Sequence, residues 1–196
     1  MVNTRSAAAI IAGGLATRFG GQDKSRLHIS GLSIISRQVA MLQPLTDDLF
    51  VVATQRERFA DTTLRVVPDV LPGTGVLGAI LTALESTDAD RVLVVACDLP
   101  FLTTALMQRL LDLASDADGA WVHTPSGAEP LIACYRRHAA PRVRQEIEAG
   151  RLRAADLGRV LTLGEIGLDE LRTFGEPSRL IANINSPKDL STIENS

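Results

Sequence analysis

The sequence has little of what marks secreted, membrane-bound or nucleic-acid-binding proteins. Its two cysteines, Cys97 and Cys134, each lie in an apolar stretch, which predicts reduced thiols in the core rather than a disulfide. No apolar run approaches the roughly 20 residues of a membrane helix, and residues 7–12 are too few for the core of a signal peptide. The formal net charge of −3 disfavours a nucleic-acid partner. We therefore expect a cytoplasmic protein that binds neither membranes nor nucleic acid.

Patterns of covalent catalysis are also missing. The sequence has no Ser-His-Asp or Cys-His arrangement, and His28, His123 and His138 lack the spacing of metal ligands. We interpret these histidines as structural. A reaction carried out by this chain would depend on positioning and charge neutralisation rather than on a protein nucleophile.

What the sequence does contain is a regular alternation of apolar runs and amphipathic stretches over 196 residues, 45% of them hydrophobic and 22% charged. The alternation predicts strands and helices that follow one another, with Thr103 as the N-cap of a helix. This order is typical of an α/β fold, a Rossmann-like three-layer αβα sandwich with a mostly parallel sheet. The predicted strands are residues 7–12, 49–53, 64–67 and 92–96, and the predicted helices are 33–42, 77–84 and 103–114.

Beyond residue 119 the pattern is looser. It predicts strands at 120–123, 131–135 and 159–163 and a helix at 141–148. No linker, repeat or low-complexity segment interrupts the chain, which predicts a single domain. Several arginines are spread along helical segments in this part, and we interpret them as a solvated face: Arg136, Arg137, Arg142, Arg144, Arg151 and Arg153.

The segment "IIAGGLATRFGGQDKS", residues 10–25, follows the first predicted strand. In open parallel sheets ligands bind beyond the carboxyl ends of the strands, where this segment and "CDLP", residues 97–100, both begin. Glycines in such a loop let backbone amides turn towards an anion. A Walker A loop is excluded, because Gln22 and Asp23 separate the last glycine from Lys24.

A dinucleotide-binding fingerprint is a competing interpretation. "GTGVLG", residues 73–78, matches G-x-G-x-x-G, precedes a predicted helix and has Asp98 about 20 residues further on. However, the first glycine of that fingerprint should leave its strand directly, and here "PDVLP" intervenes with two prolines that cannot donate to a ladder. This interpretation also leaves the first glycine loop without a role.

A nucleoside triphosphate site makes use of both loops. The glycines of residues 13–21 would fold the backbone around the phosphates, and Arg18 and Lys24 would supply positive charge. Asp98, at the end of a buried strand, would hold the Mg²⁺ that accompanies the phosphates. The chemistry favoured by this arrangement is phosphoryl or nucleotidyl transfer.

Four segments in order resemble the molybdenum cofactor guanylyltransferases, the MobA-like nucleotidyltransferases. "IAGGLATRFGGQDK" is similar to the family's L-A-G-G-x-S-x-R-M-G-x-D-K signature, and "VVPDVLPGTGVLGAI" to its acidic residue followed by G-P-L-A-G-I. "VACDLPFL" is similar to C-D-x-P-[FY]-[IL], and "NINSPKDL" to N-[IV]-N-[TS]-P-x-[DE]-L. The resemblance extends from residue 8 to residue 190.

The resemblance implies transfer of GMP from GTP to the terminal phosphate of molybdopterin, with Mg²⁺ as cofactor and pyrophosphate as the second product. We expect a nucleotide-binding half at about residues 7–115 and an acceptor-binding half at about 116–190. The implied catalytic residues are Arg18, Lys24 and Asp98. The implied nucleotide contacts are Ile11, Ala12, Gly13, Gly14, Lys24, Asp69 and Asp98, and the implied metal ligands are Asp98 and, from sugar-nucleotide relatives, Asn185.

Some of these residues also have purely structural interpretations. Asp69 could start a turn before Pro72, and Asp98 could cap the helix near Thr103. Asn185 could cap the last helix.

The identity of the base and of the acceptor is open to alternatives. Cytidylyltransferases for the same cofactor resemble the chain but usually carry Ala-Ala-Gly at residues 12–14; Gly13 and the Asp23-Lys24 pair favour GTP. Ala53 stands where family members can offer an asparagine to the nucleotide. Another nucleotide, another phosphorylated acceptor and a non-catalytic nucleotide-binding relative are the alternatives. Molybdoenzymes or their chaperones are further candidate partners, because an unstable cofactor calls for direct handover.

Overall fold

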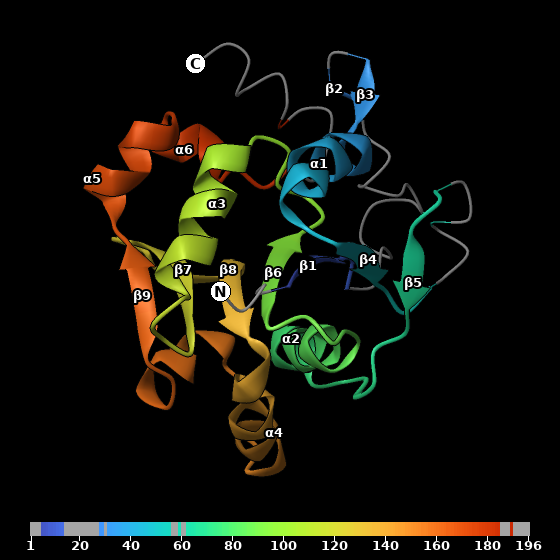
Figure 1. The fold of residues 1–196 in the computed structure, drawn as a ribbon, viewed down its shortest axis with the longest axis vertical. Helices are drawn as coiled ribbons and strands as arrows, with labels where there is room; N and C mark the ends of the chain where they lie inside the picture. Colours follow the sequence, from blue (N-terminus) through green and yellow to red (C-terminus); the bar gives the residue numbers. More distant parts are fainter. Residues whose placement is uncertain are drawn as a thin grey trace.

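The structure is a computed structural model, and it describes residues 5–13, 28–29, 31–55, 59, 62–184 and 189 of the 196. Within this part the chain forms a seven-stranded sheet in the order β5-β4-β1-β6-β8-β7-β9 and a separate pair of short strands, β2 and β3. Helices lie on both sides of the large sheet (Figure 1), which gives three layers. The predicted α/β architecture with a mostly parallel sheet is confirmed. None of the described helices is both long and apolar enough to cross a bilayer.

The first half of the chain forms parallel strands and the helices between them. The large-sheet strands are β1 (Ser6–Ile11), β4 (Asp48–Val52), β5 (Arg65–Val67) and β6 (Arg91–Ala96). The helices are α1 (Ile34–Leu42), α2 (Gly75–Glu85) and α3 (Thr104–Leu113), and the small strands are β2 (His28–Ile29) and β3 (Leu32–Ser33). The bounds of the large-sheet strands and of the three helices agree closely with the prediction, which did not include β2 and β3. Thr103 is the N-cap of α3, as expected, and accepts a hydrogen bond from the amide of Leu106 (3.3 Å).

The second half completes the sheet and reverses one strand. Its elements are β7 (Gly119–Thr124), β8 (Gly127–Arg136), α4 (Ala140–Glu148), β9 (Leu163–Ile166), α5 (Leu168–Leu171) and α6 (Pro177–Leu180). Strand β8 is antiparallel to both β6 and β7, while β9 pairs with β7 in parallel. Strand β7 therefore runs in the same direction as β1 and β6.

The strand predicted at residues 159–163 is wrong. Residues Ala154–Arg159 form a 3₁₀ helix, η6, and strand β9 begins only at Leu163. The amide of Leu161 donates to the carbonyl of Leu157 (2.9 Å), a helical turn that places both leucine side chains in the core and leaves Val160 exposed. The apolar spacing here reflects a single turn of helix rather than the alternation of a strand.

Strand β1 lies in the middle of the sheet and is buried along its whole length. Its side chains alternate between two cores: Ala8 and Ile10 lie in the core formed with α1 and α3, and Ala7, Ala9 and Ile11 in the core formed with α2. The short alanine side chains leave room for the larger side chains of the helices that cover both faces. Both predicted core thiols are buried and form no disulfide, and burial raises the pKa of Cys134 to about 12.

The connection between α3 and β7 is held by Asp118. One carboxylate oxygen of Asp118 lies 2.8 Å from Nε2 of His138, and the other accepts hydrogen bonds from Arg142 (2.7 Å) and the amide of Thr162 (2.9 Å). The side chain of Asp118 is only 12% exposed. Burial acts to raise the pKa of this carboxyl, but the hydrogen bonds from Thr162 and His138 and the charge of Arg142 outweigh burial, and the pKa is lowered. Asp118 thus links β7, α4 and the segment before β9.

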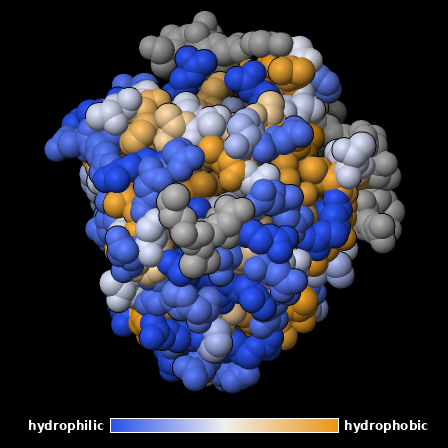
Figure 2. Space-filling view, in the orientation of Figure 1, coloured by the Kyte–Doolittle hydropathy of each residue, from blue (hydrophilic) through white to orange (hydrophobic). Residues whose placement is uncertain are grey.

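The end of the molecule that carries α4 is mainly hydrophilic on the face shown in Figure 2. Ion pairs hold several of its arginines: Arg142 with Asp118, Arg144 with Glu85 and Arg151 with Glu146. These contacts agree with the interpretation of the arginines in this part as surface charges with structural partners.

We predict that Asp118→Asn destabilises the protein by about 1–3 kcal/mol at neutral pH, because a mostly buried carboxylate with charged partners is lost. A lowered pKa means that the stabilisation is complete above the unfolded value near 4 and disappears as the pH falls through the lower folded value. Urea unfolding at several pH values measures this difference. The control is Asp169→Asn, which removes an exposed ion pair with Arg172 and should change stability by less than about 0.5 kcal/mol. An Asp118→Asn effect that persists unchanged at pH 2 would contradict the electrostatic explanation.

Candidate functional site

Neighbouring strand ends meet at the carboxyl edge of the sheet. The amide of Ala12 donates to the carbonyl of Val52 (2.9 Å), and the amide of Cys97 donates to the carbonyl of Ile11 (3.0 Å). These bonds extend the parallel pairing one residue beyond β1 and β6. The segments that follow β1, β4 and β6 therefore leave the sheet side by side, where ligands of α/β sheets bind.

The first of these segments begins inside the sheet. Ile11 and Ala12 are only 5% and 2% exposed and belong to the two cores, so their side chains are not available to a ligand. Gly13 is exposed, and no described atom lies within 4 Å of the position that a Cβ would take there. The remaining predicted residues of this loop lie outside the described residues: Gly14, Arg18 and Lys24.

Asp98 lies in the turn that follows β6. Its carbonyl accepts a hydrogen bond from the amide of Ile184 (2.8 Å), which brings the C-terminal segment to the same edge of the sheet. Asn185, the predicted second metal ligand, directly follows Ile184 in the sequence but lies outside the described residues. Since Thr103 itself caps α3, that helix does not require Asp98 as its cap.

Side chains of helix α1 donate hydrogen bonds to the turn of Asp98 and to the residue that follows it. Nε2 of Gln38 donates to the carbonyl of Ala96 (2.6 Å) and to that of Leu99 (3.1 Å). Nε of Arg37 donates to the carbonyl of Pro100 at 3.4 Å. The sequence analysis did not single out Gln38, because a glutamine inside an amphipathic helix matches no motif and its partners lie 58 and 61 residues away.

Asp69 has a structural role in the loop between β5 and α2. Its Oδ1 accepts a hydrogen bond from the amide of Leu71 (2.9 Å) and lies 3.1 Å from Oγ1 of Thr82. The buried Thr82 hydroxyl also accepts from the amide of Val70 (3.1 Å) and lies 2.8 Å from the carbonyl of Gly78. The turn interpretation of Asp69 is confirmed, and the same contacts fix the carboxylate at the start of this loop.

The glycines of "GTGVLG" serve the turn into α2. Gly73 and Gly75 have φ values of 93° and 65°, which other residues rarely adopt. A Cβ at Gly78 would lie 1.9 Å from Oγ1 of Thr74, so close packing excludes a side chain there. The segment follows the edge strand β5 after an intervening loop, whereas the dinucleotide fingerprint leaves its strand directly.

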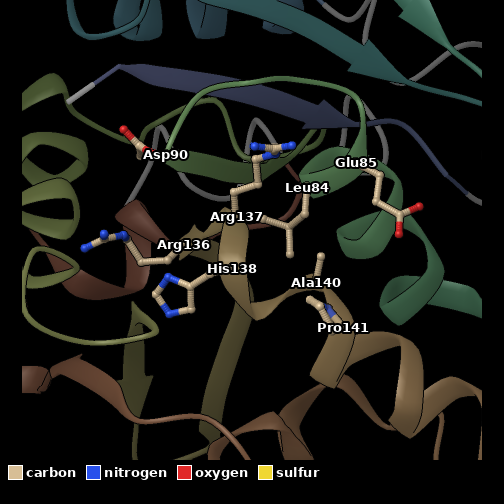
Figure 3. Close-up of a pocket in the computed structure, with 8 residues that line it drawn as sticks. All are labelled: Leu84, Glu85, Asp90, Arg136, Arg137, His138, Ala140 and Pro141. Carbon is tan, nitrogen blue, oxygen red and sulfur yellow. The ribbon is translucent and has the colours of Figure 1, made fainter. Parts of the chain in front are cut away.

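A cavity of about 450 Å³ lies at the opposite edge of the sheet, between the end of α2 and the start of α4 (Figure 3). Its charged side chains point in different directions rather than towards one ligand. These side chains already have partners within the protein. Glu85 pairs with Arg144, Arg136 donates to the carbonyl of Ser115, Arg137 pairs with Asp88, and His138 lies against Asp118. This cavity is therefore not part of the predicted nucleotide site.

Glu129 is a further acidic residue at the carboxyl edge that the sequence analysis missed. The pairing of β7 with β8 shifts between Trp121, opposite Ala133, and Val122, opposite Glu129. Because β7 runs parallel to β6, this end of the hairpin lies at the same edge as Asp98. Burial raises the pKa of Glu129. No sequence motif includes Glu129. Its position opposite Val122 depends on the shift in the pairing of β7 with β8, which the sequence does not reveal.

The chain is similar to known nucleotidyltransferases over most of its length. Residues 8–161 match the MobA-like NTP transferase domain. A "probable molybdenum cofactor guanylyltransferase" of Chloroflexus aggregans is 32% identical over 192 residues, covering 94% of this chain and 91% of that protein. A molybdenum cofactor guanylyltransferase of Shewanella baltica strain OS155 is 32% identical over 147 residues, covering 73% of this chain and 75% of that protein.

A solved structure has the same fold. The crystal structure of molybdopterin-guanine dinucleotide biosynthesis protein A from Archaeoglobus fulgidus aligns with a TM-score of 0.78 at 22% identity, covering 96% of this chain and 97% of that one. The matched residues 8–161 include the first glycine segment, Asp69 and Asp98. The chain belongs to the MobA-like NTP transferase family of nucleotidyltransferases.

Proposed function

We propose that this protein transfers GMP from GTP to the terminal phosphate of molybdopterin, forming the guanine dinucleotide cofactor and pyrophosphate. The observation that carries the proposal is the bond from the Cys97 amide to the Ile11 carbonyl (3.0 Å). This bond brings the start of the glycine segment next to the start of the turn of Asp98, which supports a site in which one triphosphate contacts both. The printed names of the Chloroflexus and Shewanella relatives support the choice of GTP and of the molybdenum cofactor as substrates.

The transfer needs no covalent enzyme intermediate. An oxygen of the acceptor phosphate attacks the α-phosphorus of GTP, the bond to the β-phosphate oxygen breaks, and pyrophosphate leaves with that electron pair. Arg18 and Lys24 neutralise the charge that develops on the phosphates, and the backbone amides of the glycine segment orient them. This division of roles agrees with the absence of a nucleophile–base pattern from the sequence.

Nucleotidyltransferases of this family typically need a divalent metal, and we propose Mg²⁺. One carboxylate together with substrate phosphates is a usual donor set for Mg²⁺, and Asp98 supplies such a carboxylate at the carboxyl edge. The hydrogen bond from Ile184 to the Asp98 carbonyl supports Asn185 as a second oxygen donor. The bound ion would neutralise phosphate charge and polarise the α-phosphate.

Recognition of the base is assigned to the groups that remain accessible near the strand ends. Among the described residues, no atom lies within 4 Å of a Cβ at Gly13, and Asp69 has a second carboxylate oxygen besides the one that orders its own loop. The acceptor-binding half at about 116–190 is proposed to hold molybdopterin, with handover of the product to a molybdoenzyme or its chaperone.

The first experiment is calorimetric titration of the purified protein with GTP, CTP, ATP and NAD, with and without Mg²⁺. We expect selective binding of GTP, tighter with Mg²⁺. Selective CTP binding would retain the mechanism and change the product. NAD binding would overturn the proposal in favour of the dinucleotide interpretation. Pyrophosphate release with molybdopterin as acceptor then distinguishes an enzyme from a relative that only binds nucleotides.

We predict that Asp98→Asn lowers the rate of pyrophosphate release at least about 100-fold and removes most of the gain in GTP affinity that Mg²⁺ provides, because the amide lacks the charge that binds the ion. The substitution keeps the main-chain bond from Ile184 to the Asp98 carbonyl, and the melting temperature checks that the variant folds. The control is Asp112→Asn on the exposed face of α3, which should leave both quantities unchanged. Full activity in the Asp98 variant would place the metal elsewhere.

We predict that Gly13→Ala folds normally but binds GTP at least about tenfold more weakly, a loss of about 1.4 kcal/mol. In the proposed site the methyl group would lie against the bound nucleotide, and no described atom lies within 4 Å of the added Cβ. Gly167→Ala, at another glycine with open space beside it, is the matched control and should bind GTP normally. Titration of both variants with GTP and CTP measures the effect. Unchanged affinity for both nucleotides would remove Gly13 from the site.

A further inference from the structure

Gln38 is a polar side chain inside the core that lies between α1 and the sheet. It is 1% exposed, and its Oε1 has no hydrogen-bond partner among the described residues. An unpartnered amide oxygen in the core costs stability, and a leucine or methionine would fill the same space without that cost. The benefit of a glutamine at this position must therefore come from its other polar atom.

That atom, Nε2, bridges the two ends of the turn that carries Asp98. It donates to the carbonyl of Ala96, the last residue of β6, and to the carbonyl of Leu99, the residue after Asp98. The bond that the turn makes within itself, from the Leu99 amide to the Ala96 carbonyl, is long at 3.4 Å. The contacts of Gln38, at 2.6 and 3.1 Å, are therefore the closer restraints on the turn.

Two neighbouring contacts join the same helix to residues that follow the turn. Arg37 donates to the carbonyl of Pro100 at 3.4 Å, and Oγ1 of Thr104 donates to the carbonyl of Met41 at 3.0 Å. The turn is thus held from the α1 side by Gln38 and from the C-terminal side by the bond from Ile184 to the Asp98 carbonyl. A carboxylate on so short a turn can point in a fixed direction only if the backbone on both sides of it is fixed.

We propose that Gln38 is a positioning residue, whose amide nitrogen fixes the turn at residues 96–99 and thereby the direction of the Asp98 carboxylate. The consequence for metal binding rests on the proposed function, but the hold on the turn does not. Gln38 touches neither substrate nor metal in this scheme. It acts through the backbone on either side of Asp98.

The test is Gln38→Met, which keeps an unbranched side chain of similar size and removes both hydrogen bonds. Hydrogen exchange by mass spectrometry on the metal-free, nucleotide-free protein should show at least about tenfold faster exchange in peptides that cover residues 96–102, with no change at residues 119–136. The Mg²⁺ concentration for half-maximal pyrophosphate release should rise about tenfold, while KM for GTP at saturating Mg²⁺ changes less than about twofold.

Met41→Ala is the matched control, because Met41 is a buried residue of the same helix whose side chain makes no hydrogen bond to the turn. It should lower the melting temperature as much as Gln38→Met or more, yet leave exchange at 96–102 and the Mg²⁺ dependence unchanged. Normal exchange at 96–102 in Gln38→Met, or equal acceleration in Met41→Ala, would overturn the proposal. A wild-type protein without Mg²⁺-dependent GMP transfer would overturn the proposed function instead, and the exchange result would still decide the role of Gln38.

Discussion

The parallel pairing of β1 with β6 is the constraint on which the rest of the site depends. Its register sets Ile11 opposite Ala96, so the glycine segment and the turn of Asp98 begin at the same level of the sheet. Both faces of β1 are buried, and a shift by one residue would move its alternating side chains to the wrong cores. The hydrophobic cores thereby fix the relative height at which the two loops begin.

Strand β8 is antiparallel to β6 and β7, which places its two ends at opposite edges of the sheet. Because β8 runs against its neighbours, its C-terminal residues Arg136 and the following Arg137 and His138 lie at the edge opposite Asp98, where they pair with carboxylates and carbonyls. Its N-terminal part, with Glu129, lies at the carboxyl edge instead. In the proposed function, the β7–β8 hairpin is the part of the acceptor-binding half that would face the nucleotide site, and the arginine-rich end contributes ion pairs that stabilise the fold.

The sequence was sufficient to predict the large-sheet strands and the helices of the first half, because those strands are mainly apolar and Thr103 marks a helix start, but it did not predict the short pair β2 and β3. It failed at residues 159–163, where leucines spaced by one helical turn resemble a strand. It also missed the 3₁₀ helix η6, the short helices α5 and α6, and Gln38, whose contacts join residues about 60 positions apart in the chain. Motifs located Asp98 and Asp69, but only the structure relates Asp69 to Thr82 and Asp98 to Ile184.

Few side chains in the described part of the carboxyl edge are available to distinguish one nucleotide from another. Ile11, Ala12 and Ala53 direct their side chains into the cores, each with 5% or less of its surface exposed. In the proposed site, discrimination would come from main-chain groups, from the position beside Gly13 and from the few polar side chains near the strand ends, among them the half-buried Asp69 and the exposed Thr54 and Gln55 after β4. Backbone groups are held by the sheet and cannot adjust to a different base. A site of this construction would distinguish bases by the fit of their shape against a rigid backbone, which makes a single methyl group at residue 13 a more severe change than its size suggests.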